Sequence, residues 1–273
     1  MKNITLALIA IAGFSGLSTA FAGTSAIKAA NNQVGFQLVS THVDYTETGD
    51  GVLVPSGTLD TEKGPVPGYA LAISTMQDLW LGNDYIEAQY DHGSGNTEYV
   101  GGLLGPPPTP YGSVVGTSGA TLTNYSARYG AGFIVNDQSM LTPYLELGHH
   151  EWDRGVNLGE LYTHNYYGIG VLGQYTPADR LVLSARAMFG STFGSNIVVN
   201  GVFSGALGNS ALFKAGAAAD YALVQNLHAT LDVEYTSFNY GISALYPYGG
   251  GYAWEPDSST KYTTVRVGLG AAF

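Results

Sequence analysis

The chain ends in a stretch that alternates between apolar and small or polar side chains: Thr264-Val265-Arg266-Val267-Gly268-Leu269-Gly270-Ala271-Ala272-Phe273. Val265, Val267 and Leu269 share one parity, and Arg266 falls on the other. Successive side chains of a β-strand point to opposite faces of the sheet. The stretch therefore predicts a strand with one apolar face and one polar face.

The same period of two recurs along the rest of the chain. With the last stretch it predicts ten strands, at residues 33–45, 68–77, 83–92, 122–135, 141–151, 164–176, 180–190, 210–222, 226–239 and 261–273. Long connections lie between them at 46–67, 93–121, 152–163, 191–209 and 240–260. Short connections that hold turn-forming residues lie at 78–82, 136–140, 177–179 and 223–225. This alternation is typical of an antiparallel up-and-down β-barrel, and we predict ten strands, with eight as the alternative.

The first predicted strand is irregular. Phe36 and Leu38 share a parity that Val43 and Tyr45 do not. A β-bulge inserts one extra residue and so changes the parity. We therefore predict a bulge at Gly35 or within residues 39–40, with a different register of this strand as the alternative.

The composition excludes several classes of protein. Only 11% of the residues are charged, while there are 38 Gly and 20 Tyr, no Cys, and a formal net charge of −11. A nucleic-acid binder needs a basic surface, and a disulfide scaffold needs cysteines. A disordered chain would have more charge and fewer aromatic residues. A β-rich protein in an unusual solvent fits these numbers best.

Residues 1–22 predict a secretory signal peptide. Lys2 gives the positive start, residues 4–17 are apolar, and Ala20-Phe21-Ala22 forms an A-x-A cleavage pattern. We predict cleavage after Ala22, which leaves residues 23–273 as one barrel domain. No later stretch approaches the ~20 consecutive apolar residues of a spanning helix, so a mature chain in a membrane must cross it as strands.

The position of aromatic residues favours a membrane barrel over the alternative, a secreted β-sandwich. Mid-strand charges fall opposite the apolar face, and aromatic residues collect at the strand ends, as in the belts at the two membrane interfaces. Those near the long connections are Tyr45, Tyr69, Tyr90, Tyr125, Trp152, Tyr167, Phe189 and Tyr235. Those near the short connections are Trp80, Phe133, Tyr175, Tyr221 and Phe273.

The charges of the polar faces are predicted to meet inside the barrel at mid-height. The acids of this belt are Glu87, Asp91, Glu146, Asp220, Asp232 and Glu234, and the bases are Arg128, Arg186, Lys214 and Arg266. Folding the strands about their turns sets Lys214 opposite Glu234, Asp220 opposite His228, Arg266 beside Glu234, Arg186 beside Lys214 and Glu87 beside Arg128. Ionisable groups at membrane depth must face inward and pair. The belt predicts a salt-bridge plug, with a narrow, weakly cation-favouring pore as the alternative.

The leader and the closing strand, Thr264 to Phe273, resemble those of small bacterial outer-membrane β-barrel proteins of the OmpA-like and opacity-protein kind. The resemblance implies a location in the bacterial outer membrane, among its lipids and lipopolysaccharide. It also implies that the barrel-assembly machinery reads Val265, Val267, Leu269 and Phe273 as a signal.

Two enzyme families with outer-membrane barrels are alternatives to a non-enzymatic protein. Omptin proteases use acidic and Asp–His pairs on facing sides of the barrel mouth, and this chain offers Asp91-His92 and His149-His150 near Asp153 but no evident facing acidic pair. Lipid A deacylases carry a His-x-Ser on the lipid-facing wall, and His92-Gly93-Ser94 has that spacing. No phosphate loop, zinc spacing or nicotinamide fingerprint occurs, so we expect no cofactor and no metal.

The long connections are acidic and rich in tyrosine and glycine. Tyr246, Tyr248 and Tyr252 lie in the last of them. Tyrosine- and glycine-rich loops make good recognition surfaces. We therefore expect a surface protein whose loops bind an extracellular ligand or serve adhesion.

Overall fold

A computed structural model describes residues 23–102 and 109–273. The predicted signal peptide, residues 1–22, lies outside the described residues, so its cleavage stays a prediction. Within the described part of the chain, no helix is long and apolar enough to cross a membrane.

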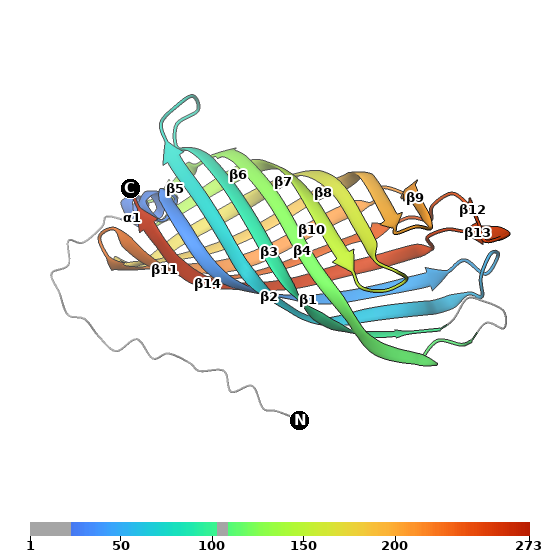
Figure 1. Ribbon diagram of the computed structural model, residues 1–273. Helices are drawn as coiled ribbons and strands as arrows, with labels where there is room; N and C mark the ends of the chain where they lie inside the picture. Colours follow the sequence, from blue (N-terminus) through green and yellow to red (C-terminus); the bar gives the residue numbers. More distant parts are fainter. Residues whose placement is uncertain (1–22, 103–108) are drawn as a thin grey trace.

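Ten long antiparallel strands form the barrel (Figure 1). They are β1 (Gln33–Gly49), β2 (Gly57–Gln77), β3 (Asp84–Gly101), β4 (Val114–Ala131), β6 (Ser139–Arg154), β7 (Glu160–Ala178), β8 (Leu181–Val199), β10 (Ala211–Val224), β11 (Leu227–Tyr240) and β14 (Asp257–Ala272). Each pairs with the next in the chain, and β14 pairs with β1, which closes the sheet. The predicted ten-stranded up-and-down barrel is confirmed, and the count of eight is wrong.

Four short strands and one helix complete the described fold. They are α1 (Gly23–Ala30), β5 (Phe133–Asn136), β9 (Phe203–Ala206), β12 (Tyr246–Tyr248) and β13 (Gly251–Ala253). β5 follows β4 and pairs with β6, β9 pairs with the end of β8, and β12 and β13 form a separate hairpin. Both α1 and the chain's C-terminus lie at the end of the barrel that carries the short turns (Figure 1).

The outer wall is apolar, which excludes the secreted sandwich. Leu38, Val267 and Leu231 lie side by side on β1, β14 and β11 with 66%, 54% and 47% of their surface exposed. In a sandwich these side chains would form a dry interior between two sheets. Here they point outward, toward a solvent that must itself be apolar.

The strands extend well beyond their predicted ends on the side of the long connections. β2 begins at Gly57 rather than residue 68, and the β1–β2 connection shrinks to residues 50–56. The prediction stopped where the outward face turned polar. Strand pairing continues there because backbone hydrogen bonds form equally well above an apolar belt, with polar side chains facing water.

The bulge predicted at Gly35 or residues 39–40 is wrong. β1 pairs with both β14 and β2 in unbroken register from Gln33 to Glu47. Phe36 and Leu38 point outward, whereas Val43 and Tyr45 are fully buried in the lumen. The register of the strand does not change. The apolar residues change parity because the lumen itself is lined by apolar side chains at the height of Val43 and Tyr45.

Helix α1, which the sequence analysis did not anticipate, blocks the turn-side end of the lumen. Ile27 is fully buried, and the helix packs against β6, β7 and β8. Asn31 donates from Nδ2 to Gln174 at 2.7 Å, and the Oδ1 of Asn32 accepts the Met76 N–H at 2.9 Å. These bonds tie the helix end to the inner wall.

We predict that a charge on the outer wall destabilises the barrel according to its depth. Val267→Arg should lower the free energy of unfolding in lipid vesicles by about 2–4 kcal/mol, because Val267 lies within the apolar belt. Thr263→Arg, outward on the same strand but above the belt, should cost about 0–1 kcal/mol. Urea titration of both variants in vesicles measures the difference, and equal losses would contradict the outward placement of Val267.

Candidate functional site

The outer wall carries most of the aromatic residues that the sequence assigned to the membrane interfaces. Near the loops, the exposed or half-buried ones are Tyr69, Tyr90, Tyr125, Tyr167, Phe189 and Tyr235. Near the turns they are Trp80, Phe133, Tyr175, Tyr221 and Phe273. Tyr45 and Trp152 are exceptions, because both are fully buried inside the barrel. Their assignment to the interface is corrected: each has the parity of the lumen.

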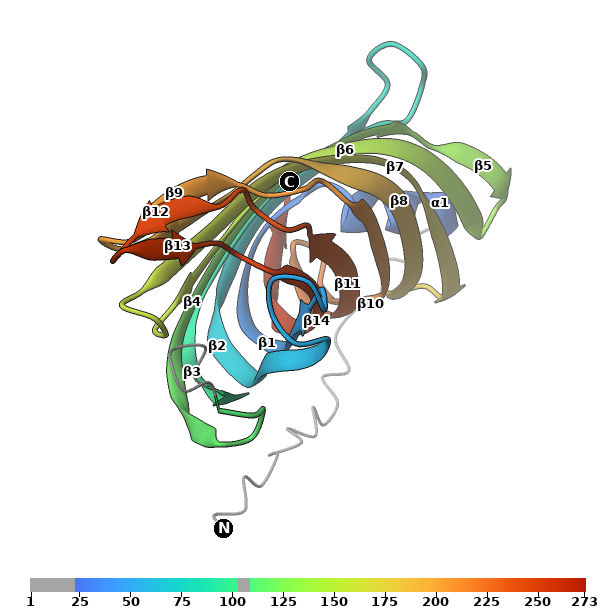
Figure 2. The same cartoon turned by 90° about the vertical axis from the view of Figure 1, so that its right-hand side faces the viewer.

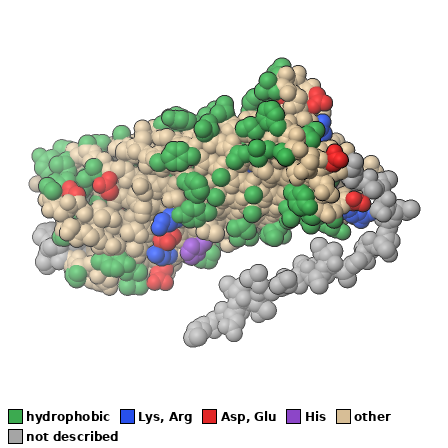
Figure 3. Space-filling model, turned by 180° about the vertical axis from the view of Figure 1, so that it is seen from behind, with side chains coloured by type: hydrophobic (Ala, Val, Ile, Leu, Met, Phe, Trp, Pro, Cys, Tyr) green, Lys and Arg blue, Asp and Glu red, His purple; other side chains and the backbone are tan. Residues whose placement is uncertain are grey.

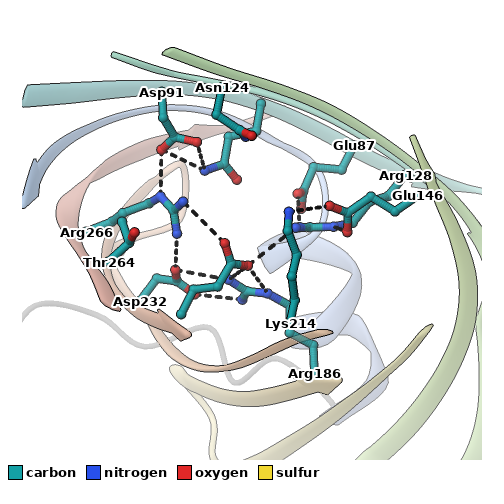
Figure 4. A network of polar contacts seen from close by, with 12 residues as sticks. Glu87, Asp91, Asn124, Arg128, Glu146, Arg186, Lys214, Asp232, Thr264 and Arg266 are labelled. Carbon is teal, nitrogen blue, oxygen red and sulfur yellow. Dashed lines mark hydrogen bonds and ion pairs between the residues drawn. The ribbon is translucent and has the colours of Figure 1, made fainter. Parts of the chain in front are cut away.

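One half of the lumen charge belt centres on Arg128 and Glu146 (Figure 4). Glu87 lies opposite Arg128 in the register of β3 and β4, and the two form an ion pair. The Arg128 Nε donates to Glu146 at 2.7 Å, and the Lys214 Nζ donates to the other oxygen of Glu146 at 2.7 Å. Lys214 also donates to the hydroxyl of Tyr166 at 2.9 Å.

The other half centres on Asp232 and Glu234 of β11. Arg186 donates to Asp232 at 2.6 Å and to Glu234 at 2.8 Å. Arg266 of β14 donates to Asp232 at 2.7 Å and to Asp91 of β3 at 2.7 Å. Arg128 lies 3.7 Å from Glu234, which joins the two halves into one network across the barrel.

Some predicted partners are displaced. Lys214 lies opposite Thr236 rather than Glu234, because the β10–β11 hairpin turns at Gln225 and Asn226 rather than about residue 224. In the register, Gly216 of β10, not Lys214, lies between Arg186 of β8 and Glu234 of β11. Moving the centre of a hairpin turn by one residue moves every pair of its two strands by two positions.

Asp220 does not belong to the mid-height belt. It accepts from the Gln33 Nε2 at 3.0 Å and pairs with the His228 Nδ1 at 2.5 Å, nearer the turns. Its partner His228 was predicted, although the two residues are not opposite each other in the register. A cavity of about 140 Å³ lies in this region, between α1 and the charge belt, and is lined by glutamines and by belt residues.

Above the charge belt the lumen is filled by aromatic rings and histidines. Trp152, Tyr162 and Tyr240 are fully buried, and the Trp152 and Tyr162 rings stack with centroids 5.8 Å apart. His150 bonds Tyr262 at 3.1 Å, and His164 bonds Tyr240 at 2.8 Å. These side chains fill much of the lumen at this height, and a small cavity of about 50 Å³ remains between His150, His164, Phe238 and Tyr262 and the charge belt.

Near the mouth, buried carboxylates surround a single buried guanidinium. Arg154 donates to Glu62 at 2.9 Å and to Glu160 at 2.9 Å, and lies 3.6 Å from Asp60. The ring of Tyr45 lies 4.3 Å from the same guanidinium carbon. These acids come from β2 and β7 on facing sides, so the inference that no acidic groups face each other across the barrel is wrong.

A sixth group enters this cluster from the last long connection. Glu255 follows β13, is 4% exposed, hydrogen-bonds Tyr162, and accepts from the Tyr45 hydroxyl at 3.3 Å. Its backbone is clamped to Ser243, with the Glu255 N–H donating to the serine hydroxyl at 2.8 Å. Burial raises the pKa of Glu255 to about 8, and the charge of Glu160 adds to the rise.

The mouth cluster was missed because the sequence analysis placed its residues in loops. The alternation of 33–45 continues to Glu47, that of 141–151 continues to Trp152 and Arg154, and that of 164–176 extends back to Tyr162 and Glu160. Extending each parity beyond the apolar belt would have found these residues. Glu255 has no such signal, since it is in a loop.

The weak catalytic candidates are not assembled into a site. His92 points outward and its Nδ1 lies 3.2 Å from the hydroxyl of Thr123, while the Ser94 hydroxyl lies 3.2 Å from that of Thr121. Among the hydrogen bonds of the described residues, none joins His92 to Ser94. Nor does that part of the chain hold a group of three or more side chains suited to a metal ion.

The Asp–His pairs considered for an omptin-like site are also divided between the two faces. Asp91 points inward to Arg266, whereas His92 points outward. His149 is outside, held between Asn165 at 2.9 Å and Glu151 at 3.1 Å. Neighbours along a strand cannot share a face, so neither pair can act as one unit.

Comparison with known proteins supports the fold alone. No protein-family model and no curated protein matches the chain. Among solved structures, the outer membrane protease OmpT from Escherichia coli superposes with a TM-score of 0.61 at 10% identity, over 90% of this chain and 97% of that one. Ail from Yersinia pestis gives 0.33 at 12% identity (89% and 99% covered), and the toluene transporter TodX from Pseudomonas putida gives 0.35 at 10% (92% of both). The chain is thus a β-barrel of the outer-membrane type, as its resemblance to small outer-membrane barrels implied.

We predict that Glu234 is essential to the stability of the charge belt. Glu234→Gln leaves the guanidinium groups of Arg186 and Arg266 buried with reduced compensation, and should cost about 3–5 kcal/mol of unfolding free energy. Glu98→Gln, at an exposed carboxylate, should stay within about 0.5 kcal/mol of the parent. Urea unfolding measures both, and a loss under about 1 kcal/mol for Glu234→Gln would contradict a tightly coupled belt.

We also predict that the mouth opens at alkaline pH. The folded protein holds the Glu255 proton more tightly than the unfolded chain does. The stability that the neutral carboxyl contributes is therefore complete below pH 4.5, the usual pKa of a glutamate, and is lost as the pH rises to about 8, the pKa of Glu255 in the folded protein. Hydrogen exchange of residues 241–256 should therefore accelerate from about pH 5 to about pH 9, after correction for the intrinsic rate.

Glu255→Gln imitates the neutral carboxyl and should abolish this extra acceleration, with Glu98→Gln as the matched control. Identical corrected profiles for the parent and Glu255→Gln would show that Glu255 does not hold the mouth closed.

Proposed function

We propose that the protein is an integral barrel of the bacterial outer membrane that does not conduct solutes and acts through its extracellular surface. The observation that carries the proposal is the filling of the lumen at successive heights. Helix α1 lies at the turn end, the charge belt lies at mid-height, and the aromatic layer and the Arg154 cluster lie above it. An eight-stranded barrel is just filled by its side chains, and ten strands enlarge the interior modestly.

The filled lumen supports a closed barrel over the narrow channel that the sequence left open. A conducting pore needs a continuous water-filled path, such as the polar interior of porins. The 140 Å³ cavity beside α1 is bounded on its inner side by the side chains of Arg128, Arg186 and Arg266. These guanidinium groups are held in place by carboxylates on both walls.

The same burial supports a non-enzymatic role. The acidic groups near the mouth are 0–7% exposed, and Glu62 and Glu160 pair with Arg154, which favours a structural role for them over contact with a substrate. On the outer wall, both ring nitrogens of His149 are engaged by neighbouring side chains, which leaves no free nitrogen to act as a base.

We assign the binding of extracellular partners to the loop end of the barrel. The hairpin of β12 and β13 exposes Tyr248 and Tyr252, and its Tyr246 ring stacks on Phe203 of β9 with centroids 5.0 Å apart. The positive φ angles of Gly249 and Gly250 form the tight turn between the two strands. A stiff aromatic hairpin beyond the wall fits recognition of an extracellular ligand. Lipopolysaccharide around the wall and the assembly machinery at β14 complete the proposed partners.

Planar-bilayer recording tests the closed lumen. The purified protein, folded as judged by its heat-modifiable mobility, should give no stable unitary currents when a general porin in the same bilayer does. Stable single-channel steps from the folded protein would overturn the proposal in favour of a channel. Binding to intact cells or matrix components that is lost in Tyr248→Ser/Tyr252→Ser, with conductance unchanged, would separately support the surface role.

A further inference from the structure

The turn end of the barrel carries exposed apolar side chains that extend beyond the wall. Leu79, Trp80 and Leu81 in the β2–β3 turn are 52%, 77% and 69% exposed. Next to them, the three apolar residues of β5 are also exposed: Phe133, Ile134 and Val135. We call these six residues the ledge. The β2–β3 turn projects sideways from the wall, away from the barrel axis, in both Figure 1 and Figure 2.

The projecting turn has a defined shape. One carboxylate oxygen of Asp84 accepts the backbone N–H groups of Leu79, Trp80 and Leu81 at 3.0, 2.8 and 3.0 Å. The other oxygen accepts from the Tyr129 hydroxyl at 2.7 Å. The turn therefore holds its three apolar side chains outward instead of folding them against the wall.

The second hairpin braces the turn from the side. The Gly132 N–H donates to the carbonyl of Asn83 at 2.9 Å, and the Asn83 Nδ2 donates to the carbonyl of Gly132 at 3.1 Å. Asn83 has a φ of 52°, and its own N–H is accepted by Asp78 at 2.9 Å. The two hairpins thus form one unit at the base of β5.

The ledge is continuous with the lipid-facing wall. The Trp80 and Tyr129 rings meet with centroids 6.1 Å apart. Leu81 and Phe133 line an apolar groove on the outer wall together with Leu145 and Phe189. Figure 3 shows hydrophobic side chains along the wall and on the projecting turn.

We propose that the ledge binds lipid. Its β2–β3 turn, which we call the hook, inserts Leu79, Trp80 and Leu81 among the phospholipids of the periplasmic leaflet beside the barrel. Hydrocarbon admits a backbone only when its N–H groups are paired inside the protein. Asp84 pairs the N–H groups of Leu79, Trp80 and Leu81, which are the residues proposed to enter the lipid, and Asp78 pairs that of Asn83. Tryptophan at such a site prefers the zone between headgroups and acyl chains. The hook widens the barrel's footprint on one side and thereby fixes its depth and tilt.

Tryptophan fluorescence tests the hook directly. The sequence has three Trp, and Trp152 is fully buried in the lumen. In a Trp254→Phe background, vesicles of phosphatidylcholine brominated on its acyl chains should therefore quench Trp80 and leave Trp152 bright. The double variant Trp80→Phe/Trp254→Phe should show no quenching, which assigns the signal.

A second variant separates the hook from a mere fold defect. Leu79→Ser/Leu81→Ser leaves Trp80 and the backbone bonds to Asp84 in place, and should reduce the quenching and shift the Trp80 emission to longer wavelength while the barrel stays folded. Equal Trp80 emission in brominated and ordinary vesicles would overturn the proposal. So would protection of Trp80 by a second copy of the chain, seen as quenching that appears only when the protein is diluted in lipid.

Discussion

The structure depends on one constraint: inside a bilayer, every backbone polar group must be paired within the protein, and every charge must avoid the lipid. Pairing of β14 with β1 removes the free edges of the sheet and satisfies the backbone. The strict alternation of side chains then sends Val267 outward and Arg266 inward on the same strand. Closure and alternation together determine what the interior contains.

The charged side chains of the interior are paired, which offsets the free-energy cost of burying them. Isolated ions in a lumen filled by side chains would be expensive, and each guanidinium of the belt contacts more than one carboxylate. The lumen above the charge belt is also filled by side chains, with Tyr45 and Trp152 packed around Arg154. For a barrel filled in this way we propose recognition at its surfaces, by the aromatic hairpin at one end and by the ledge at the other.

Much of the fold could be predicted because its signal is local. A period of two shows both the strands and the face of each residue, and so predicts that Glu87 and Arg128 point inward as neighbours. Position along the barrel is harder, because the alternation does not say where the lipid ends. Trp152 was therefore placed at the interface, although its parity puts it in the lumen.

Features that depend on contacts between distant parts of the chain could not be predicted from local sequence patterns. The turn between β10 and β11 is centred one residue later than expected, which moved the partner of Lys214 by two residues, and the turn residues themselves do not indicate this. Glu255 enters the mouth cluster from a loop, and α1 enters the lumen from outside the strand pattern. In the sequence, Asp84 looks like an ordinary turn residue. Only the structure shows that it accepts three backbone N–H groups.

Thiol accessibility is the most direct test of the central claim that the lumen is filled. The chain has no cysteine, so a single Cys can be introduced at Thr264, which is buried beside the charge belt, and another at the exposed Tyr252 as a reference. In vesicles, a hydrophilic maleimide applied from either side should label Tyr252→Cys from one side and leave Thr264→Cys unlabelled. Labelling of Thr264→Cys at the rate of Tyr252→Cys would show that water and solutes pass through the barrel, and would contradict this account.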